Sequence, residues 1–274
     1  MQKKKSLGQH FLRSESALRK IVEAGHLSPT DIVLEVGPGE GVLTELLLKQ
    51  AGKVIAVEKD DRLIPVLEQK FASEIASGKL ELIHADILDF NLSSYKLVAK
   101  SYKLIANIPY YITGALIRKF LESDTEPSAM VLLVQKEVAK RIVARNGKAE
   151  SNPEDSVARP AKGRSRESIL SISVKAYGTP HYIDTVKAGA FSPPPKVDSA
   201  IIAIENISKK FFADGDEKRF FELLKKGFAH PRKLLSSNLG ISADILRACG
   251  IAEKARAENL SVEKWKRVCA SLKP

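Results

Sequence analysis

The residues with the most specific chemistry form a short motif at 107–110, Asn-Ile-Pro-Tyr, which directly follows an apolar run. Asn107 offers an amide oxygen as a hydrogen-bond acceptor, and Pro109 contributes a backbone carbonyl without a competing N–H group. Tyr110 provides a flat ring on which a base can stack. Two acceptors beside a stacking surface predict a site that holds an exocyclic amino group. The alternative is a proline turn with a packed aromatic ring.

A glycine-rich turn forms a second candidate site. Gly37, Gly39 and Gly41 follow the apolar run Ile32–Val36, and Glu58 ends the next apolar run. Glycine lets the backbone approach a ligand closely, and an acid at the end of the next strand can bind two ribose hydroxyls. The GxGxG spacing differs from the GxGxxG pattern that binds a pyrophosphate. The turn therefore predicts an adenosyl ligand without phosphate, which indicates S-adenosylmethionine, although three glycines also suit an ordinary tight turn.

A further acid, Asp86, follows a third strand-like run, Leu80–His84. Because parallel strands end at one edge of a sheet, we expect Asp86 on the same rim as Gly37 and Glu58. From there its carboxylate can accept a hydrogen bond from an amino group, such as that of the cofactor adenine. Strand-end aspartates also cap helices and form turns, but the repeated position favours a ligand role.

The elements that position these residues alternate between apolar strands and amphipathic helices, the pattern of an α/β fold with a largely parallel sheet. Ser14 is predicted to cap a helix ahead of the first strand. The segments Ser168–Ala176 and Ile201–Ile204 are predicted to be strands that complete a sheet of about seven. The other predicted strands are 32–36, 53–57, 80–84, 104–106 and 130–134, and the helices are 42–49, 63–76, 114–122 and 136–145.

The loop between the last two predicted strands contains three consecutive prolines, which fix a rigid, extended backbone that presents Phe191. Phe191 is either the second ring of a base sandwich or a core residue, and its type alone does not decide. Upstream, residues 146–167 hold Gly, Pro, Ser and scattered charges with few apolar side chains. That composition predicts a long surface loop.

The charge balance points to a polyanionic partner. The chain has 44 Lys and Arg against 33 Asp and Glu, a net charge of +11 and a pI near 9.5. Such an excess favours nucleic acid. Residues 206–274 are predicted to be helical throughout and carry 15 Lys and Arg against 8 Asp and Glu, a net charge of +7. This region is therefore predicted to grip RNA phosphates.

Cysteine usage and hydropathy restrict the compartment. Cys249 and Cys269 show no metal-ligand spacing, so we predict free thiols and no metal site. No apolar run is long enough to cross a membrane, and the first ten residues lack the apolar core of a signal peptide. We therefore predict a cytoplasmic protein.

Seven motifs occur in a characteristic order along the chain. They are Ser-Leu-Gly-Gln-His-Phe-Leu (6–12), Glu-Val-Gly-Pro-Gly-Glu-Gly (35–41), Val-Glu-Lys-Asp (57–60), Ala-Asp-Ile (85–87), Asn-Ile-Pro-Tyr-Tyr-Ile-Thr (107–113), Val-Gln-Lys-Glu-Val-Ala (134–139) and Phe-Ser-Pro-Pro-Pro-Lys-Val-Asp-Ser-Ala (191–200). In these motifs the chain resembles the ribosomal RNA adenine dimethyltransferases, most closely the KsgA type, which acts on small-subunit rRNA. The resemblance extends into the helical region at 227–233 and 257–261.

The resemblance implies a Rossmann-like class I methyltransferase domain with a seven-stranded sheet in residues 1–205 and a small, all-helical, RNA-binding domain in 206–274. It implies S-adenosyl-L-methionine as the cofactor. The implied partner is small-subunit rRNA within a pre-ribosomal particle, bound by a monomer without a membrane. The implied activity is methyl transfer to N6 of two adjacent adenosines in the 3′-terminal hairpin loop of small-subunit (16S) rRNA, which contributes to small-subunit biogenesis.

The resemblance also implies roles for single residues. Asn107 lies between the cofactor and the target base, Pro109 supplies the second acceptor, and Tyr110 and Phe191 flank the flipped adenine. The residues implied to bind the cofactor are Gln9, His10, Leu12, Gly37, Gly39, Gly41, Glu58, Asp86, Ile87 and Asn107. The chain departs from the family in two places, since many members have Asn at the position of His10 and a shorter loop at 146–167.

Three alternative functions are weighed against this one. A dimethyltransferase of the macrolide-resistance type would modify large-subunit rRNA, but the helical-region match and the 194–200 segment argue against it. A non-catalytic ribosome assembly factor would keep the fold, but it would have no need of the intact motif at 107–110. A dinucleotide oxidoreductase is disfavoured by the glycine spacing.

Overall fold

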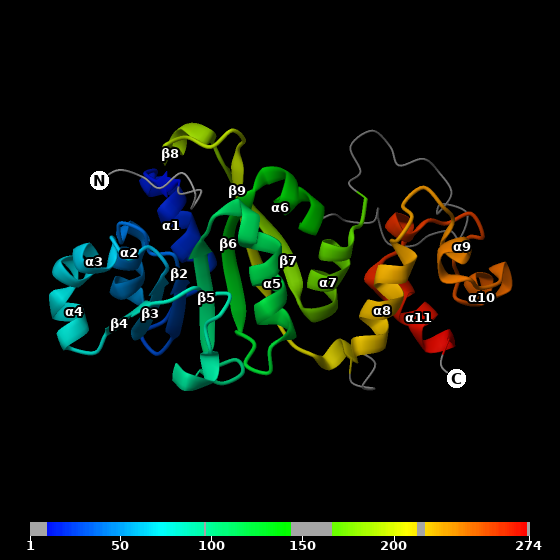
Figure 1. Cartoon of the computed structure of the whole chain (residues 1–274), viewed down its shortest axis with the longest axis horizontal. Helices are drawn as coiled ribbons and strands as arrows, with labels where there is room; N and C mark the ends of the chain where they lie inside the picture. The colour runs from blue at the N-terminus through cyan, green and yellow to red at the C-terminus, as the bar shows by residue number, and fades with distance from the viewer. Residues whose placement is uncertain (1–9, 96, 144–165, 213–216, 273–274) are drawn as a thin grey trace. The chain divides into compact units, whose positions relative to one another are not determined.

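The computed structural model describes residues 10–95, 97–143, 166–212 and 217–272 (Figure 1). The chain forms two compact units. The first comprises Met1–Ala139 and Gly178–Ser208, and the second comprises Lys140–Tyr177 and Lys209–Pro274. The second unit thus includes a segment that the sequence analysis placed ahead of residue 206.

The first unit is built on a seven-stranded sheet with the order β4-β3-β2-β5-β6-β9-β7. Strands β2 to β6 pair in parallel, whereas β9 pairs antiparallel with both β6 and β7. The predicted Rossmann-like sheet of seven strands is confirmed. The strands are β2 (Ile32–Val36), β3 (Lys53–Glu58), β4 (Leu80–His84), β5 (Tyr102–Asn107), β6 (Ala129–Gln135), β7 (Thr179–Val186) and β9 (Ser199–Glu205).

The central strands are apolar because the sheet is covered on both faces. Leu34, Val54 and Leu104 are fully buried. From β2 the chain continues to β3 on one side, while β5 lies on the other side, so the strand order reverses between β2 and β5. In open α/β sheets, ligands bind at such a switch point, beyond the carboxyl ends of the strands.

The helices of the first unit position the loops at that edge. Ser14 caps α1 as predicted, with its hydroxyl accepting from the Ala17 N–H group. The predicted helix over 63–76 is divided at Phe71 into two helices. The elements are α1 (Glu15–Ala24), α2 (Val42–Gln50), α3 (Ile64–Lys70), α4 (Ala72–Ala76), η2 (Leu92–Tyr95), η3 (Tyr110–Ile112), α5 (Thr113–Glu122) and η5 (Ala188–Ala190), followed by α6 (Lys136–Val143), which runs into the second unit.

A separate two-stranded ladder joins the start of the described chain to the proline-rich loop. Strand β1 (Phe11–Leu12) pairs antiparallel with β8 (Phe191–Ser192), with Leu12 opposite Phe191. The Arg13 N–H group extends the ladder by donating to the Ala190 carbonyl at 2.8 Å. We call residues 10–13 the strap.

The prediction of a strand at Ser168–Ala176 is wrong, because this segment forms the helix α7 (Ile169–Tyr177). Its β-branched residues favour a strand in isolation, but burial in the helical unit overrides that preference. Ile172 is fully buried, and the Ser173 hydroxyl donates to the carbonyl four residues earlier at 2.7 Å. The seventh strand is instead β7, which follows α7 directly.

The second unit is helical, as predicted for residues 206–274. Its core contains Phe220, Leu224 and Trp265, all buried. A Cβ atom at Gly227 would lie 2.3 Å from the Trp265 ring, so glycine is required where α8 meets α11. The elements besides α7 are η6 (Lys210–Phe212), α8 (Glu217–Gly227), α9 (Leu235–Leu239), α10 (Ala243–Ala248), η7 (Ala257–Asn259) and α11 (Val262–Ser271).

Cys249 and Cys269 are buried free thiols, as predicted. Among the helices that the structure describes, none has the length and apolar character needed to cross a membrane.

Candidate active site

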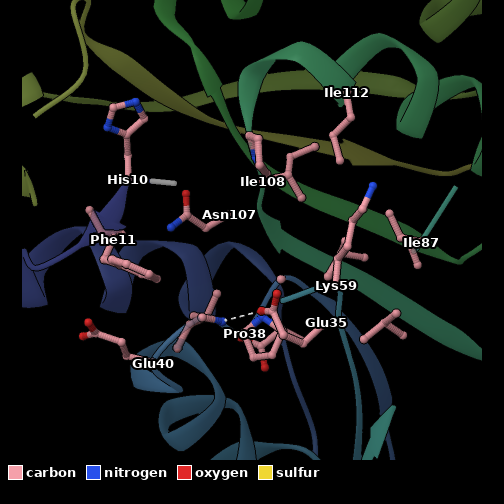
Figure 2. A pocket seen from close by; sticks show the side chains of 18 of the residues that line it. His10, Phe11, Glu35, Pro38, Glu40, Lys59, Ile87, Asn107, Ile108 and Ile112 are labelled. Carbon is pink, nitrogen blue, oxygen red and sulfur yellow. Dashed lines mark hydrogen bonds between the residues drawn. The ribbon is translucent and has the colours of Figure 1, made fainter. Parts of the chain in front are cut away.

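A pocket lies in the first unit at the carboxyl ends of β2, β3 and β5, and the strap forms one of its walls (Figure 2). Most of the predicted site residues come together here. Gly41 does not line this pocket, and Gln9 lies outside the described residues. The predicted residues that line it are His10, Leu12, Gly37, Gly39, Glu58, Asp86, Ile87, Asn107, Pro109, Tyr110 and Phe191.

The glycine loop has a positive φ at each of its glycines, +70° at Gly37, +61° at Gly39 and +74° at Gly41. The space around them differs. A Cβ at Gly39 would lie 3.0 Å from the Phe11 ring of the strap, and one at Gly41 would lie 2.5 Å from the Phe71 ring. Gly41 is therefore glycine because of packing behind the loop, whereas Gly39 lets the strap close over the loop.

The Glu58 carboxylate holds the glycine loop through hydrogen bonds to backbone N–H groups. One carboxylate oxygen accepts from the Gly39 N–H group at 3.0 Å, and the other accepts from the Asp60 N–H group at 2.8 Å. Burial raises the pKa of Glu58 above its ordinary value, and these backbone hydrogen bonds partly oppose that rise. A carboxylate has about four acceptor sites, so Glu58 keeps acceptor capacity for a ribose hydroxyl beside its bonds to backbone N–H groups.

Asp86 is held by a lysine that the sequence analysis did not single out. Its Oδ2 lies 2.5 Å from Lys59 Nζ, and its Oδ1 accepts from the Leu88 N–H group at 2.9 Å. The hydrogen bond from Lys59 lowers the pKa of Asp86. The carboxylate is thus ionised and acts as an acceptor, the state needed to bind an adenine amino group.

A second missed residue, Glu35, lies in the pocket wall just before the glycine loop. It is only 1% exposed, and burial raises its pKa to about 8. The nearby Thr44 hydroxyl opposes this rise, yet among the described residues neither Glu35 Oε2 nor the Thr44 hydroxyl has a hydrogen bond of normal length. A charged residue within the apolar run of β2 was the signal in the sequence.

The motif at 107–110 reaches the same pocket. Asn107 is the last residue of β5, and no described residue hydrogen-bonds its side-chain amide. The Pro109 carbonyl accepts from the Ile112 N–H group at 3.2 Å, which leaves it one further lone pair. The Tyr110 hydroxyl forms a hydrogen bond with Ser199 Oγ at 2.6 Å, and burial raises its pKa.

Aromatic residues surround this motif. The His10 ring faces the Tyr110 ring, with centroids 6.1 Å apart and planes inclined by 22°. Phe191 is 5% exposed and belongs to the hydrophobic core, although it also reaches the pocket wall. Tyr111, which the sequence analysis did not single out, also lines the pocket and is 65% exposed.

The pocket fits an adenosyl ligand that carries an amino acid group. The strand-end acids Glu58 and Asp86 are acceptors of the kind that ribose hydroxyls and an adenine amino group need, and Glu35 Oε2 is a buried polar atom without a described partner in the same pocket. Together, the sheet, the GxGxG loop and this row of acids define a Rossmann-like, S-adenosylmethionine-dependent methyltransferase.

The chain belongs to the ribosomal RNA adenine dimethylase family, whose model matches residues 1–273. It is 44% identical to a ribosomal RNA small subunit methyltransferase A of Dehalococcoides mccartyi, over 97% of this chain and 87% of that protein. A protein of the same name from Fusobacterium nucleatum is 36% identical, over 96% of this chain and 94% of its own length. The chain is therefore an rRNA adenine dimethyltransferase.

Solved structures agree with this assignment. A dimethyladenosine transferase from Plasmodium falciparum superposes with a TM-score of 0.75 and 28% identity, over 94% of this chain and 96% of that one. The 23S rRNA methyltransferase ErmE superposes with a TM-score of 0.71 over 96% of this chain and 99% of its own. At 24% identity the second match shows the shared fold alone.

Proposed function

We propose that the chain transfers methyl groups from S-adenosylmethionine to N6 of two adjacent adenosines in the 3′-terminal hairpin loop of small-subunit rRNA. The observation that carries the proposal is the placement of the Asn107 amide, the Pro109 carbonyl and the Tyr110 ring in the same pocket as the glycine loop and Glu58. The small-subunit target is supported by the relatives at 44% and 36% identity, whose names specify that subunit.

The residues proposed to hold the cofactor follow from the acceptors in the pocket. Glu58 binds the ribose hydroxyls, and Asp86 binds the adenine amino group beside Ile87. The loop at Gly37 and Gly39 lies against the methionine part, with the strap residues His10 and Leu12 over it. When bound, S-adenosylmethionine supplies an electrophilic methyl group on a sulfonium centre.

The chain's part in the chemistry is to prepare the adenine nitrogen. The N6 lone pair is delocalised into the ring, which makes the amine a weak nucleophile. Asn107 Oδ1 and the remaining lone pair of the Pro109 carbonyl accept its two N–H groups, which turns the nitrogen towards a tetrahedral geometry and localises its lone pair. Acceptors fixed in advance in this way stabilise the charge that develops in the transition state. No general base is required, since the methylated nitrogen is acidic enough to lose a proton to water.

Flipping the base requires it to leave its stack, at a cost of a few kcal/mol that is smallest for an unpaired loop nucleotide. Tyr110 offers a ring face to the everted base. This accounts for a hairpin-loop adenosine as substrate.

The helical unit is proposed to bind rRNA phosphates within the pre-ribosomal particle. Lys225, Lys226, Arg232 and Lys233 are all exposed near the end of α8 and in the turn that follows it. Phosphate contacts of this kind make binding depend steeply on salt. We further propose that the chain acts as a monomer in the cytoplasm.

Mass spectrometry of rRNA tests the proposal. Undermodified small subunits and large subunits are incubated separately with the full chain and isotope-labelled S-adenosylmethionine, and the rRNA is digested and mapped. The expected product is N6,N6-dimethyladenosine at two adjacent positions of the small-subunit fragment. Label in large-subunit rRNA would indicate the macrolide-resistance activity, and particle binding without any label would indicate an assembly factor.

A further inference from the structure

Two facing aromatic rings stand in the pocket, and each is fixed at its polar edge. The His10 Nδ1–H group donates to the Pro193 carbonyl at 2.8 Å. The Tyr110 hydroxyl is held by Ser199 at 2.6 Å. Because a carbonyl oxygen can only accept, this bond requires a proton on His10 Nδ1, and it also sets the orientation of the ring. Both rings are therefore held by partners outside the pair.

The spacing of the rings is close to that of a slot for a planar base. Their centroids lie 6.1 Å apart and their planes are inclined by only 22°. A base between two rings needs about 7 Å, twice the contact distance of roughly 3.5 Å between carbon atoms. The distance between the two ring centroids is about 1 Å shorter than this value.

The wall formed by His10 belongs to a small element that is separate from the seven-stranded sheet. His10 directly precedes β1, a strand of two residues that pairs only with the two residues of β8. Its hydrogen-bond partner Pro193 directly follows β8. The ring and its anchor therefore lie at one end of the same short ladder, whereas Tyr110 lies in η3, which follows the sheet strand β5.

Phe191 has a different environment. It is 5% exposed, lies opposite Leu12 in the ladder and packs in the hydrophobic core with Leu18 and Ile21. A ring that is this buried packs against the ladder and has little exposed surface on which a base could stack. His10 is partly exposed and has its face directed towards Tyr110.

We infer that the His10 side chain is the second wall of the base slot, opposite Tyr110, and that Phe191 serves mainly as the support of this wall. The inference rests on the proposed function, because it assumes an everted adenine as the occupant. His10 is thus a base-binding residue in addition to its place beside the cofactor. Stacking on an aromatic ring is tolerant of ring type, so another flat side chain should replace it.

Fluorescence of 2-aminopurine tests the inference. The probe is a small-subunit hairpin RNA with 2-aminopurine in place of the first target adenosine, titrated with the full chain in the presence of S-adenosylhomocysteine. Stacking between two rings quenches the fluorescence of the everted base. His10→Ala should weaken formation of the quenched complex by about 10- to 100-fold, and His10→Phe should restore it to within a few-fold of wild type.

Parallel measurements separate stacking from folding and from cofactor affinity. Melting temperature and the affinity for S-adenosylhomocysteine are measured for each variant, and rescue by His10→Phe identifies the ring face as the cause of the loss. Wild-type quenching by His10→Ala would overturn the inference. The same holds if Phe191→Leu, but not His10→Ala, abolishes quenching in protein that still binds S-adenosylhomocysteine.

The proposed function can fail separately. If the wild-type chain neither methylates the unmodified hairpin or small subunit nor quenches the probe, the assignment of the substrate fails. If the wild-type chain does both and His10→Ala behaves identically, only the role of His10 fails.

Discussion

Both units of the molecule contain buried glutamates, and two of these, Glu167 and Glu35, have opposite environments. Glu167 in the helical unit has its Oε1 2.5 Å from Lys175 Nζ, and its Oε2 accepts from the Ser171 hydroxyl at 2.5 Å. Glu35 in the sheet unit has no salt bridge to any described residue, and its Oε2 has no described hydrogen-bond partner. Of these two residues, only Glu35 lines the pocket of the candidate active site.

Two asparagines repeat the contrast. The Asn238 side-chain NH2 group in the helical unit donates to the carbonyls of Gly227 at 2.7 Å and His230 at 3.1 Å. The Asn107 amide lines the pocket without a described partner. Polar groups that are paired within the chain stabilise the fold, whereas those left unpaired at a strand end are available to a ligand. The comparison therefore separates residues needed for stability from residues needed for chemistry.

Loss of the paired glutamate should have the largest effect on stability. Glu167→Ala removes the buried ion pair with Lys175 and the hydrogen bond from Ser171, and it should lower the free energy of unfolding of the helical unit by about 3–5 kcal/mol. Trp265, the only tryptophan of the chain, lies in that unit, so its fluorescence during guanidinium unfolding measures the effect. Arg166→Ala, which removes an ion pair to Glu258 from a side chain that is 57% exposed, should cost less than about 1 kcal/mol. Equal losses in the two variants would contradict the comparison.

Loss of the unpaired asparagine should affect catalysis instead. Asn107→Ala should reduce methyl transfer by about 10²- to 10³-fold, since one acceptor of the amine is removed. Cofactor binding should weaken but stay measurable, and stability should change by less than about 0.5 kcal/mol. Single-turnover transfer of labelled methyl groups to small subunits is the measurement. The matched variant Asn238→Ala should lose about 1–3 kcal/mol of stability in the Trp265 signal. Wild-type turnover by Asn107→Ala would refute its role.

The buried Glu35 carboxyl should make the stability of the fold depend on pH. With a pKa raised from 4.5 to about 8, Glu35 is protonated in the folded chain and ionised in the unfolded chain between those values. The folded state then binds more protons, so stability falls as pH rises through this range. Glu35→Gln removes this dependence. As the pH rises from 6 to 7.5, the free energy of unfolding of this variant should therefore increase by about 2 kcal/mol relative to that of wild type. Chemical unfolding of both proteins, followed by circular dichroism over this pH range, measures the difference. If the free energies of unfolding of wild type and Glu35→Gln depend on pH in the same way, the Glu35 carboxyl is ionised in the folded chain and the prediction is wrong.

An exposed ion pair at the pocket should have the smallest effect. Arg13 lies 2.7 Å from Glu40, and the two side chains are 49% and 36% exposed. Arg13→Ala should weaken S-adenosylhomocysteine binding by less than about 1 kcal/mol, and the difference should vanish at high salt. Isothermal titration calorimetry at two salt concentrations measures this, with Arg19→Ala on α1 as a control of equal charge. A loss that persists at high salt would mean that Arg13 contacts the ligand directly.

The sequence predicted the part of the site that depends on local rules. Apolar runs followed by Gly37, Glu58, Asp86 and Asn107 identify strand ends, and parallel strands bring such ends to one edge. Each of these residues lines the pocket because its place on the rim follows from the strand before it.

The remaining features depend on contacts between distant parts of the chain. His10 takes its orientation from Pro193, which no local pattern reveals. The helix α7 was predicted to be a strand because its isoleucines and valine favour strands locally. Its burial in the helical unit, which favours the helix, depends on residues that are distant in the sequence. Glu35 was overlooked because a strand that accommodates a buried acid still has an apolar pattern.

The chain passes between the two units three times, after residues 139, 177 and 208. A stop codon after residue 208 would therefore leave α7 attached to the sheet unit while removing the aromatic rings of Phe212 and Phe221 that contact Tyr177. An independently folding sheet unit cannot be made by truncation alone. Its preparation would also require removal of residues 140–177, which lie within the sequence of the sheet unit.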